Sequence, residues 1–185
     1  KYVRSINHPK NMGISTGMKT AIKEARYENF LMVAGDGDVS LVTLIEFFKN
    51  CGKADFIGSF IMNVEERYKY RIILSAFYSI LYVVFFNVTI KYVNGMAIYP
   101  TKLLRNLEIK STGYLFNAEI AVKLLLQGIT FYEILSYINP APRKSSALKI
   151  KNVLNTIWGL FSLIWDVRVV NRKLYSKLPV RVVDK

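Results

Sequence analysis

Cysteine and histidine are nearly absent from this 185-residue sequence, which contains Cys51 and His8 and no others. A single cysteine cannot form an internal disulfide, and one cysteine with one histidine cannot supply a zinc site. His8 lies next to Pro9, with no serine, aspartate or cysteine partner that the spacing can place, so a nucleophilic triad is unsupported. The cysteine usage fits a reducing, cytosol-facing compartment.

Acidic residues are also scarce, with 13 Asp+Glu against 26 Lys+Arg and a net charge of +13. Residues 143–185 carry 10 basic and 2 acidic groups, whereas residues 1–142 carry 16 and 11. Such an excess is typical of proteins that meet nucleic acid, phosphorylated small molecules or an anionic membrane surface. Most aromatic residues fall within apolar runs such as Tyr78–Phe86, which argues against nucleic acid as the partner.

Long charge-free runs are limited to Ile72–Ile90, which spans 19 residues. A membrane-spanning helix needs about 20 apolar residues. Because Ser75, Ser79 and Asn87 interrupt this run, we favour a core or interfacial helix, and a spanning helix remains the alternative. Apolar residues make up 52% of the chain, which excludes a disordered protein.

Strand-like and helix-like segments alternate along the first three quarters of the chain. Phe30–Ala34 has the continuous apolar character of a buried parallel strand, and Ala54–Phe60 and Ile129–Ile138 predict two further strands. Helices are expected between them, so the pattern favours an α/β sheet over an all-α or all-β domain.

The C-terminal region, residues 147–185, combines basic charge with an amphipathic helix predicted over Ala147–Trp165. It contains both tryptophans of the chain, Trp158 and Trp165. Basic residues beside Trp, Leu and Ile suit a helix that lies on an anionic membrane surface. A solvated helix with one buried face fits the composition equally well.

Asp36 and Asp38 flank Gly37 directly after a predicted buried strand. Ligands of open α/β sheets bind at this end of the strands. Two like charges there favour a bound hard cation such as Mg²⁺ or Mn²⁺, which takes carboxylate and phosphate oxygens. The alternative is an ordinary Asp-Gly-Asp surface turn.

Two further pairs have the chemistry of phosphate sites. Asn11 and Gly13 precede a helix whose amino end can receive a phosphate, although a plain loop explains them too. Arg71 and Ser75 are four residues apart and share a helix face, so together they can grip a phosphate. An ordinary helix-end arginine with a small packing serine is the alternative.

Three charged residues later in the chain complete the candidates. Glu119, near the start of a helix, either favours the helix dipole or points into the site as a carboxylate partner. Arg143 and Lys144, in a Pro-marked loop, either close over a diphosphate or are only solvated charge.

In order and spacing, these motifs resemble family 2 glycosyltransferases of the GT-A fold, in the branch with dolichol-phosphate mannose synthase and bacterial polyprenyl-phosphate glycosyltransferases. The resemblance covers about residues 4–150. It is carried by Asn11-x-Gly13, Gly35-Asp36-Gly37-Asp38, Ala54–Ser59, Arg71-x-x-x-Ser75, Tyr92–Pro100, Gly113–Glu119 and Arg143–Ser146.

The resemblance implies that residues 1–146 form a partial GT-A domain, with a Rossmann-like mixed sheet and flanking helices. Such a domain transfers a sugar, with inversion, from a nucleotide-sugar to a polyprenyl-phosphate or other lipid-linked or saccharide acceptor. It implies a divalent cation, Mg²⁺ or Mn²⁺, on Asp36 and Asp38, and a peripheral location on the cytoplasmic face of a membrane. The implied site residues are Asp38 and Glu119 for catalysis, Asn11, Gly13, Asp36, Arg143 and Lys144 for the donor, and Arg71, Ser75, Asn94 and Gly95 for the acceptor.

The family's first two strands, which bind the base and ribose, have no counterpart in the sequence. The chain also starts without Met in a strand-like run, so we expect a fragment that lacks its N-terminal part. A noncatalytic fragment and a basic nucleic-acid-binding module remain the alternative functions.

Overall fold

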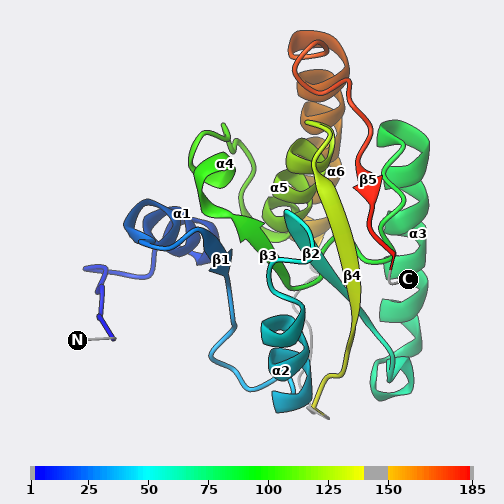
Figure 1. The fold of residues 1–185 in the computed structure, drawn as a ribbon. Helices are drawn as coiled ribbons and strands as arrows, with labels where there is room; N and C mark the ends of the chain where they lie inside the picture. The colour runs from blue at the N-terminus through cyan, green and yellow to red at the C-terminus, as the bar shows by residue number, and fades with distance from the viewer. Residues whose placement is uncertain (1–2, 140–149, 184–185) are drawn as a thin grey trace.

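The computed structural model describes residues 3–139 and 150–183. Its centre is an open five-stranded sheet in the order β1-β3-β2-β4-β5 (Figure 1). β2 pairs in parallel with β4, and β4 with β5, whereas β3 runs antiparallel to both β1 and β2. The strands are β1 (Asn29–Leu31), β2 (Phe56–Ile61), β3 (Ala97–Pro100), β4 (Thr130–Ser136) and β5 (Val180–Arg181).

Helices connect these strands, which confirms the expected α/β class with a mixed sheet. They are α1 (Ile14–Glu24), α2 (Leu41–Asn50), α3 (Lys69–Phe86), α4 (Thr101–Arg105), α5 (Phe116–Leu125) and α6 (Ile150–Trp165). Short 3-10 turns η1 (Val64–Glu66) and η2 (Gly113–Leu115) precede α3 and α5, and a π-helical turn η3 (Asp166–Val170) extends α6.

The two faces of the sheet bury different side chains, as the two-residue period of a strand requires. On one face, Ile57, Ile98 and Ile134 pack against Phe47 of α2. On the other, Phe56 and Tyr99 belong to the larger core that contains α5 and the buried residues of α3. Therefore α2 covers one face of the sheet, and α3 and α5 lie on the opposite face.

The strand before the aspartate pair differs from the prediction. Phe30–Ala34 was expected to form a buried parallel strand, but β1 ends at Leu31, runs antiparallel to β3, and has no buried residue. The physical reason is its place in the sheet, because among the described strands β1 has a neighbour on one side only.

The described part of the C-terminal region packs onto the domain before it. Leu163, Val167 and Tyr175 belong to the larger core. β5, which the sequence did not predict, adds a strand beside β4. The division of the chain at residue 146 stays a prediction.

Candidate functional site

One edge of the sheet, where the carboxyl ends of three strands lie, collects four of the predicted site residues. β1 and β2 both run antiparallel to β3, and β4 runs parallel to β2, so their carboxyl ends lie beside the amino end of β3. The Asp36–Asp38 loop follows β1, and the Asn94–Gly95 turn precedes β3. This edge is at the lower end of the sheet in Figure 1.

Backbone hydrogen bonds hold the Asp36–Asp38 loop against the segment that follows β4. The backbone N–H of Asn139 donates to the carbonyl of Asp38 (2.9 Å), and the Asn139 amide donates to the carbonyl of Gly37 (2.7 Å). Within the loop, Asp36 Oδ1 accepts from the backbone N–H of Asp38 (3.3 Å), and Gly37 has a positive φ of 78°. The two carboxylates are thus carried by a fixed turn.

The Asp38 carboxylate fits a cation. Its Oδ1 is buried and has no hydrogen-bond partner among the described residues, and a buried unpaired carboxylate oxygen is unfavourable without a ligand. No group of three or more His, Cys, Asp or Glu side chains in the described ranges is placed to hold a metal. Mg²⁺ binds through one or two carboxylates together with substrate phosphates, so two aspartates suffice for a cation that a phosphate ligand shares.

The Asn94–Gly95 turn presses against β2. A Cβ atom on Gly95 would overlap the carbonyl oxygen of Ser59, so only glycine fits there. The Ser59 hydroxyl donates to the carbonyl of Met96 (2.9 Å) and fixes the turn on the strand. Asn94 Oδ1 is buried without a hydrogen-bond partner in the described part of the chain, so this edge holds a second unpaired acceptor.

The segment between β2 and α3 ties the start of α3 to the same edge. The Asn63 side chain donates to the carbonyl of Ile138 (2.8 Å) and accepts from its backbone N–H (3.0 Å). Arg67 Nη2 donates to the hydroxyl of Tyr92 (3.2 Å), two residues before Asn94. No sequence motif singled out these residues, and a polar residue two positions after the end of β2 was the only signal for Asn63.

Arg71 and Ser75 lie in the first two turns of α3 and are half-buried. The Arg67–Tyr92 contact places the start of this helix beside the Asn94–Gly95 turn. Sheet topology and this contact therefore bring Asp36, Asp38 and Asn94 to one edge, with Arg71 on the adjoining helix.

Glu119 lies in a separate, buried charge cluster. Its carboxylate pairs with Lys123 (2.6 Å) and accepts from the backbone N–H groups of Lys110 (3.0 Å) and Ser111 (2.7 Å), as well as from the Ser111 hydroxyl. Lys123 also pairs with Asp166 (2.7 Å), which pairs with Lys110 (2.7 Å). The cluster joins α5 to the junction of α6 and η3.

The pKa values of this cluster reflect its ion pairs. Burial by itself raises the pKa of Glu119, but the hydrogen bonds from Lys123, Ser111 and Lys110 together outweigh burial and lower it. Burial also opposes the charged form of Lys123, yet Asp166 and Glu119 raise its pKa. The pKa of Asp166 is lowered for the same reason, since Lys110 and Lys123 outweigh its burial. All these groups are therefore charged near neutral pH.

Glu119 and Asp166 line a cavity of about 330 Å³ between α6 and residues 110–115. Neither Asp36, Asp38, Arg71 nor Asn94 lines it. This cavity is therefore separate from the aspartate pair.

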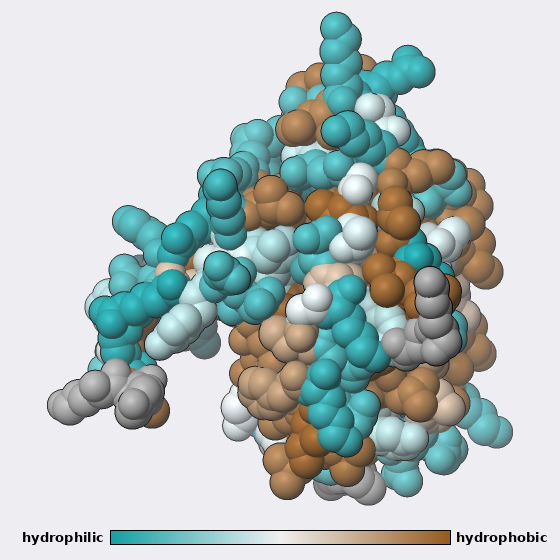
Figure 2. Space-filling view, viewed as in Figure 1, coloured by the Kyte–Doolittle hydropathy of each residue, from teal (hydrophilic) through white to brown (hydrophobic). Residues whose placement is uncertain are grey.

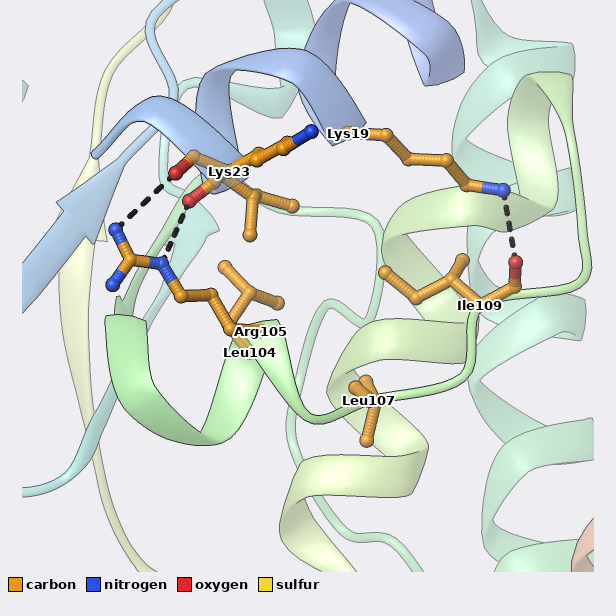
Figure 3. Close-up of a pocket in the computed structure, with 7 residues that line it drawn as sticks. Lys19, Lys23, Leu104, Arg105, Leu107 and Ile109 are labelled. Atoms are coloured by element: carbon orange, nitrogen blue, oxygen red, sulfur yellow. Dashed lines mark hydrogen bonds between the residues drawn. The ribbon is translucent and has the colours of Figure 1, made fainter.

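A second, open groove of about 460 Å³ lies between α1 and α4 (Figure 3). Arg105 of α4 donates to the carbonyl of Ile22 (3.2 Å) near the carboxyl end of α1, and Lys19 Nζ donates to the carbonyl of Ile109 (2.9 Å). Arg105 thus caps carbonyls near the carboxyl end of α1, where a cation stabilises a helix. Lys19 ties α1 to the segment after α4, so both bonds are explained by the attachment of α1 to this part of the chain.

The remaining predicted donor ligands are not joined, by contacts among the described residues, to the sheet edge that carries the Asp36–Asp38 loop. Asn11 Oδ1 accepts from the backbone N–H of Gly13 (3.0 Å), and Gly13 is the residue before α1, with φ of 80°. Arg143 and Lys144 lie outside the described residues.

Two neighbouring helices expose an apolar face. Tyr78 of α3 lies close to Thr156 of α6, and Arg168 Nε of η3 donates to the carbonyl of Phe85 (2.8 Å), so α3 lies beside α6 and η3. Each helix exposes large apolar side chains at intervals of three and four residues. We call this set the α3–α6 apolar face: Ile73, Phe77, Ile80 and Val84 of α3 with Leu154, Trp158, Phe161 and Trp165 of α6.

Figure 2 shows hydrophobic surface along its right-hand side, where α3 lies. Lys69–Phe86 and Asn152–Val170 are both long and apolar enough, by length and composition, to cross a membrane. Only 11% of the first segment and 17% of the second are buried, so neither is a mostly buried core helix.

No protein-family model matches the chain, and a search of curated proteins found no match.

Proposed function

We propose that the protein is a metal-dependent, inverting glycosyltransferase of the GT-A type that transfers a sugar from a nucleotide-sugar to a lipid-linked phosphate at a membrane surface. The observation that carries the proposal is the sheet edge where the Asp36–Asp38 loop lies near the Asn94–Gly95 turn and the start of α3.

Asp36 and Asp38 are proposed to bind a divalent cation together with the diphosphate of the donor. The buried, unpaired Oδ1 of Asp38 supports this assignment, because a cation would satisfy it. When bound, Mg²⁺ or Mn²⁺ stabilises the charge of the leaving diphosphate. Arg143 and Lys144 remain predicted donor ligands, as do Asn11 and Gly13.

Arg71 and Ser75 are proposed to hold the phosphate of the acceptor. Among the described residues Arg71 has no ion pair, so its guanidinium is available to an anion. Asn94 remains a predicted acceptor ligand, and it would donate to a phosphate oxygen through its amide NH₂ group, since its unpaired oxygen can only accept. An acceptor phosphate is already an anion and needs no strong base to attack the sugar.

Glu119 is proposed to position the loop at residues 110–111 rather than to take part in proton transfer. Its two oxygens are occupied by Lys123, Lys110 and Ser111, which leaves it poorly placed to accept a proton. Its carboxylate instead fixes the loop at residues 110–111 over the start of α5.

The α3–α6 apolar face is proposed to rest on the cytoplasmic face of a membrane that carries anionic lipids. Apolar helices with nearby Lys and Arg lie in the interface of such membranes, and the 10 basic residues of 143–185 supply the charge. Because Arg71 lies in the first turn of α3, this orientation would hold the acceptor phosphate near the lipid headgroups.

The test is transfer of labelled sugar from a set of nucleotide-sugars to a polyprenyl phosphate, using the full-length protein with and without Mn²⁺. Asp38→Asn keeps the shape but removes the charge, and we expect it to lower the rate by about 10³-fold and to abolish the Mn²⁺ dependence. Glu28→Gln, which alters an exposed carboxylate, serves as the control and should retain activity. Full Mn²⁺-dependent activity of Asp38→Asn would remove the metal role.

A further inference from the structure

We propose that the cavity between α6 and residues 110–115 binds a neutral saccharide. Its volume of about 330 Å³ lies in the range of about 300–1,000 Å³ that is typical of small-molecule sites. This proposal needs neither the cation nor the transfer reaction, because none of the residues assigned to them, apart from the positioning residue Glu119, lines the cavity.

The charged groups of the cavity pair with one another. Glu119 pairs with Lys123, and Asp166 pairs with both Lys123 and Lys110. The three charged residues that line the cavity, Lys110, Glu119 and Asp166, are thus all held in ion pairs, to which the exposed Glu108 adds a further contact with Lys110 (3.6 Å). No unpaired charged side chain is left in the described part of the lining for an ionic ligand. The cavity therefore favours a ligand that is polar but uncharged.

Uncharged hydrogen-bonding groups line the opening. Thr112, Asn155 and Ser162 border the cavity, and their side chains have no hydrogen-bond partner among the described residues. Asn155 and Ser162 are seven residues apart on α6, so they lie on one face of the helix. A ligand with several hydroxyl groups would satisfy these donors and acceptors, whereas a lipid chain would leave them unpaired.

Trp158 adds an apolar wall to this polar opening. It lines the cavity, lies between Asn155 and Ser162 along α6, and is 77% exposed. A sugar ring has an apolar face formed by its C–H groups and hydroxyl groups around its edge. Among neutral polar ligands, a saccharide thus matches both the indole ring and the hydroxyl and amide groups beside it.

Tryptophan fluorescence gives a direct test, because Trp158 and Trp165 are the only tryptophans in the sequence. Trp165→Phe leaves Trp158 as the single reporter in the cavity. Trp158→Phe leaves Trp165, which is on the same helix and 63% exposed but does not line the cavity. The probes are the methyl glycosides of glucose, mannose, galactose and N-acetylglucosamine, added without metal or nucleotide.

We expect at least one glycoside to shift the Trp158 emission saturably, with a Kd on the order of 1 mM, as suits a ligand of about a dozen non-hydrogen atoms. The Trp165 reporter should not respond. In the Trp165→Phe background, Asn155→Ala with Ser162→Ala should weaken binding about tenfold or more. Ser176→Ala, outside the cavity, should leave the Kd unchanged.

Absence of a saturable response at Trp158, or equal responses of both reporters, would overturn the proposal. A response of Trp158 to anionic phosphatidylglycerol vesicles but to no glycoside would do the same and would assign this residue to the membrane surface alone. Asp38→Asn separates the two proposals, since it should abolish sugar transfer while glycoside binding at Trp158 persists.

Discussion

Gly95 is packed so closely against β2 that its missing side chain has a structural role. A methyl group there would overlap the carbonyl of Ser59 and crowd the ring of Tyr92. We expect Gly95→Ala to lower the free energy of unfolding by about 1–3 kcal/mol, the usual effect of overpacking. Urea unfolding followed by circular dichroism measures the change.

Gly17 offers the matched control, because it lies within α1 and a Cβ there would meet nothing within 4 Å. Alanine is favoured over glycine in a helix by about 0.5–1 kcal/mol. Gly17→Ala should therefore raise stability. Equal effects of the two substitutions would show that the contact between Gly95 and Ser59 is unimportant.

Lys123 is fully buried and neutralises two carboxylates, Glu119 and Asp166. Lys123→Met would leave these carboxylates without their shared partner, and removing one member of a buried ion pair costs about 3–5 kcal/mol. We expect a loss of this size in the free energy of unfolding at pH 7. Lys173→Met, at an exposed lysine, should change it by less than about 0.5 kcal/mol.

The same cluster predicts how stability depends on pH. The pKa of Glu119 is below its ordinary value of 4.5 and that of Asp166 below 3.8 in the folded protein. The stability that these two ionised carboxylates contribute is therefore fully present at a pH above their ordinary pKa values. It is lost as the pH falls through their lower pKa values in the folded protein. The pKa of Lys123 is raised, so its contribution is complete below 10.5 and is lost at higher pH.

Acidification should therefore lower the free energy of unfolding of the natural protein. It should also reduce the difference in this free energy between the natural protein and Lys123→Met, because protonation discharges the carboxylates that the variant leaves unpaired. Urea titrations at neutral pH and below the ordinary pKa of Asp166 measure this difference. A gap that stays constant with pH would contradict the assignment of these charges.

At the scale of elements, α3 and α6 present apolar side chains to solvent, whereas α2 covers the opposite face of the sheet. Phe77 and Ile80 of α3 are 55% and 60% exposed. Burying a large apolar side chain is worth about 1.5–3 kcal/mol. We expect Phe77→Glu with Ile80→Glu to weaken binding to anionic vesicles by at least about tenfold in a sedimentation assay.

Phe48→Glu is the control, because Phe48 is 71% exposed but lies on α2. It should leave vesicle binding nearly unchanged. If Phe48→Glu reduced binding as much as the α3 variant does, the apolar face would not be the membrane contact.

At the scale of the whole molecule, the net charge of +13 should steer the protein to anionic membranes. We expect binding to phosphatidylglycerol vesicles to weaken with added salt, as screening requires, and binding to neutral phosphatidylcholine vesicles to be weaker at low salt. Alkaline carbonate should release the protein from membranes. Retention after carbonate treatment would instead indicate that Lys69–Phe86 or Asn152–Val170 spans the bilayer.

Local patterns predicted most helices and the strands near Phe56 and Thr130, because hydrophobic periodicity and breaker residues act within a few residues. They also indicated that Asp36 and Asp38 follow a strand. They were wrong about the burial of that strand, since a short apolar run is equally compatible with an outer strand and with a central strand of a sheet. β5 was missed because two residues carry no periodic signal.

The amino-acid sequence by itself determined the α/β class, the positive charge of residues 143–185 and the short spacing between Asp36 and Asp38, all of which depend on composition or on near neighbours. Only the tertiary structure decided that Lys123 joins Glu119 to Asp166, that Gly95 touches Ser59, and that α3 lies beside α6. These contacts join segments far apart in the chain, and side-chain packing selects them in a way that no local pattern records.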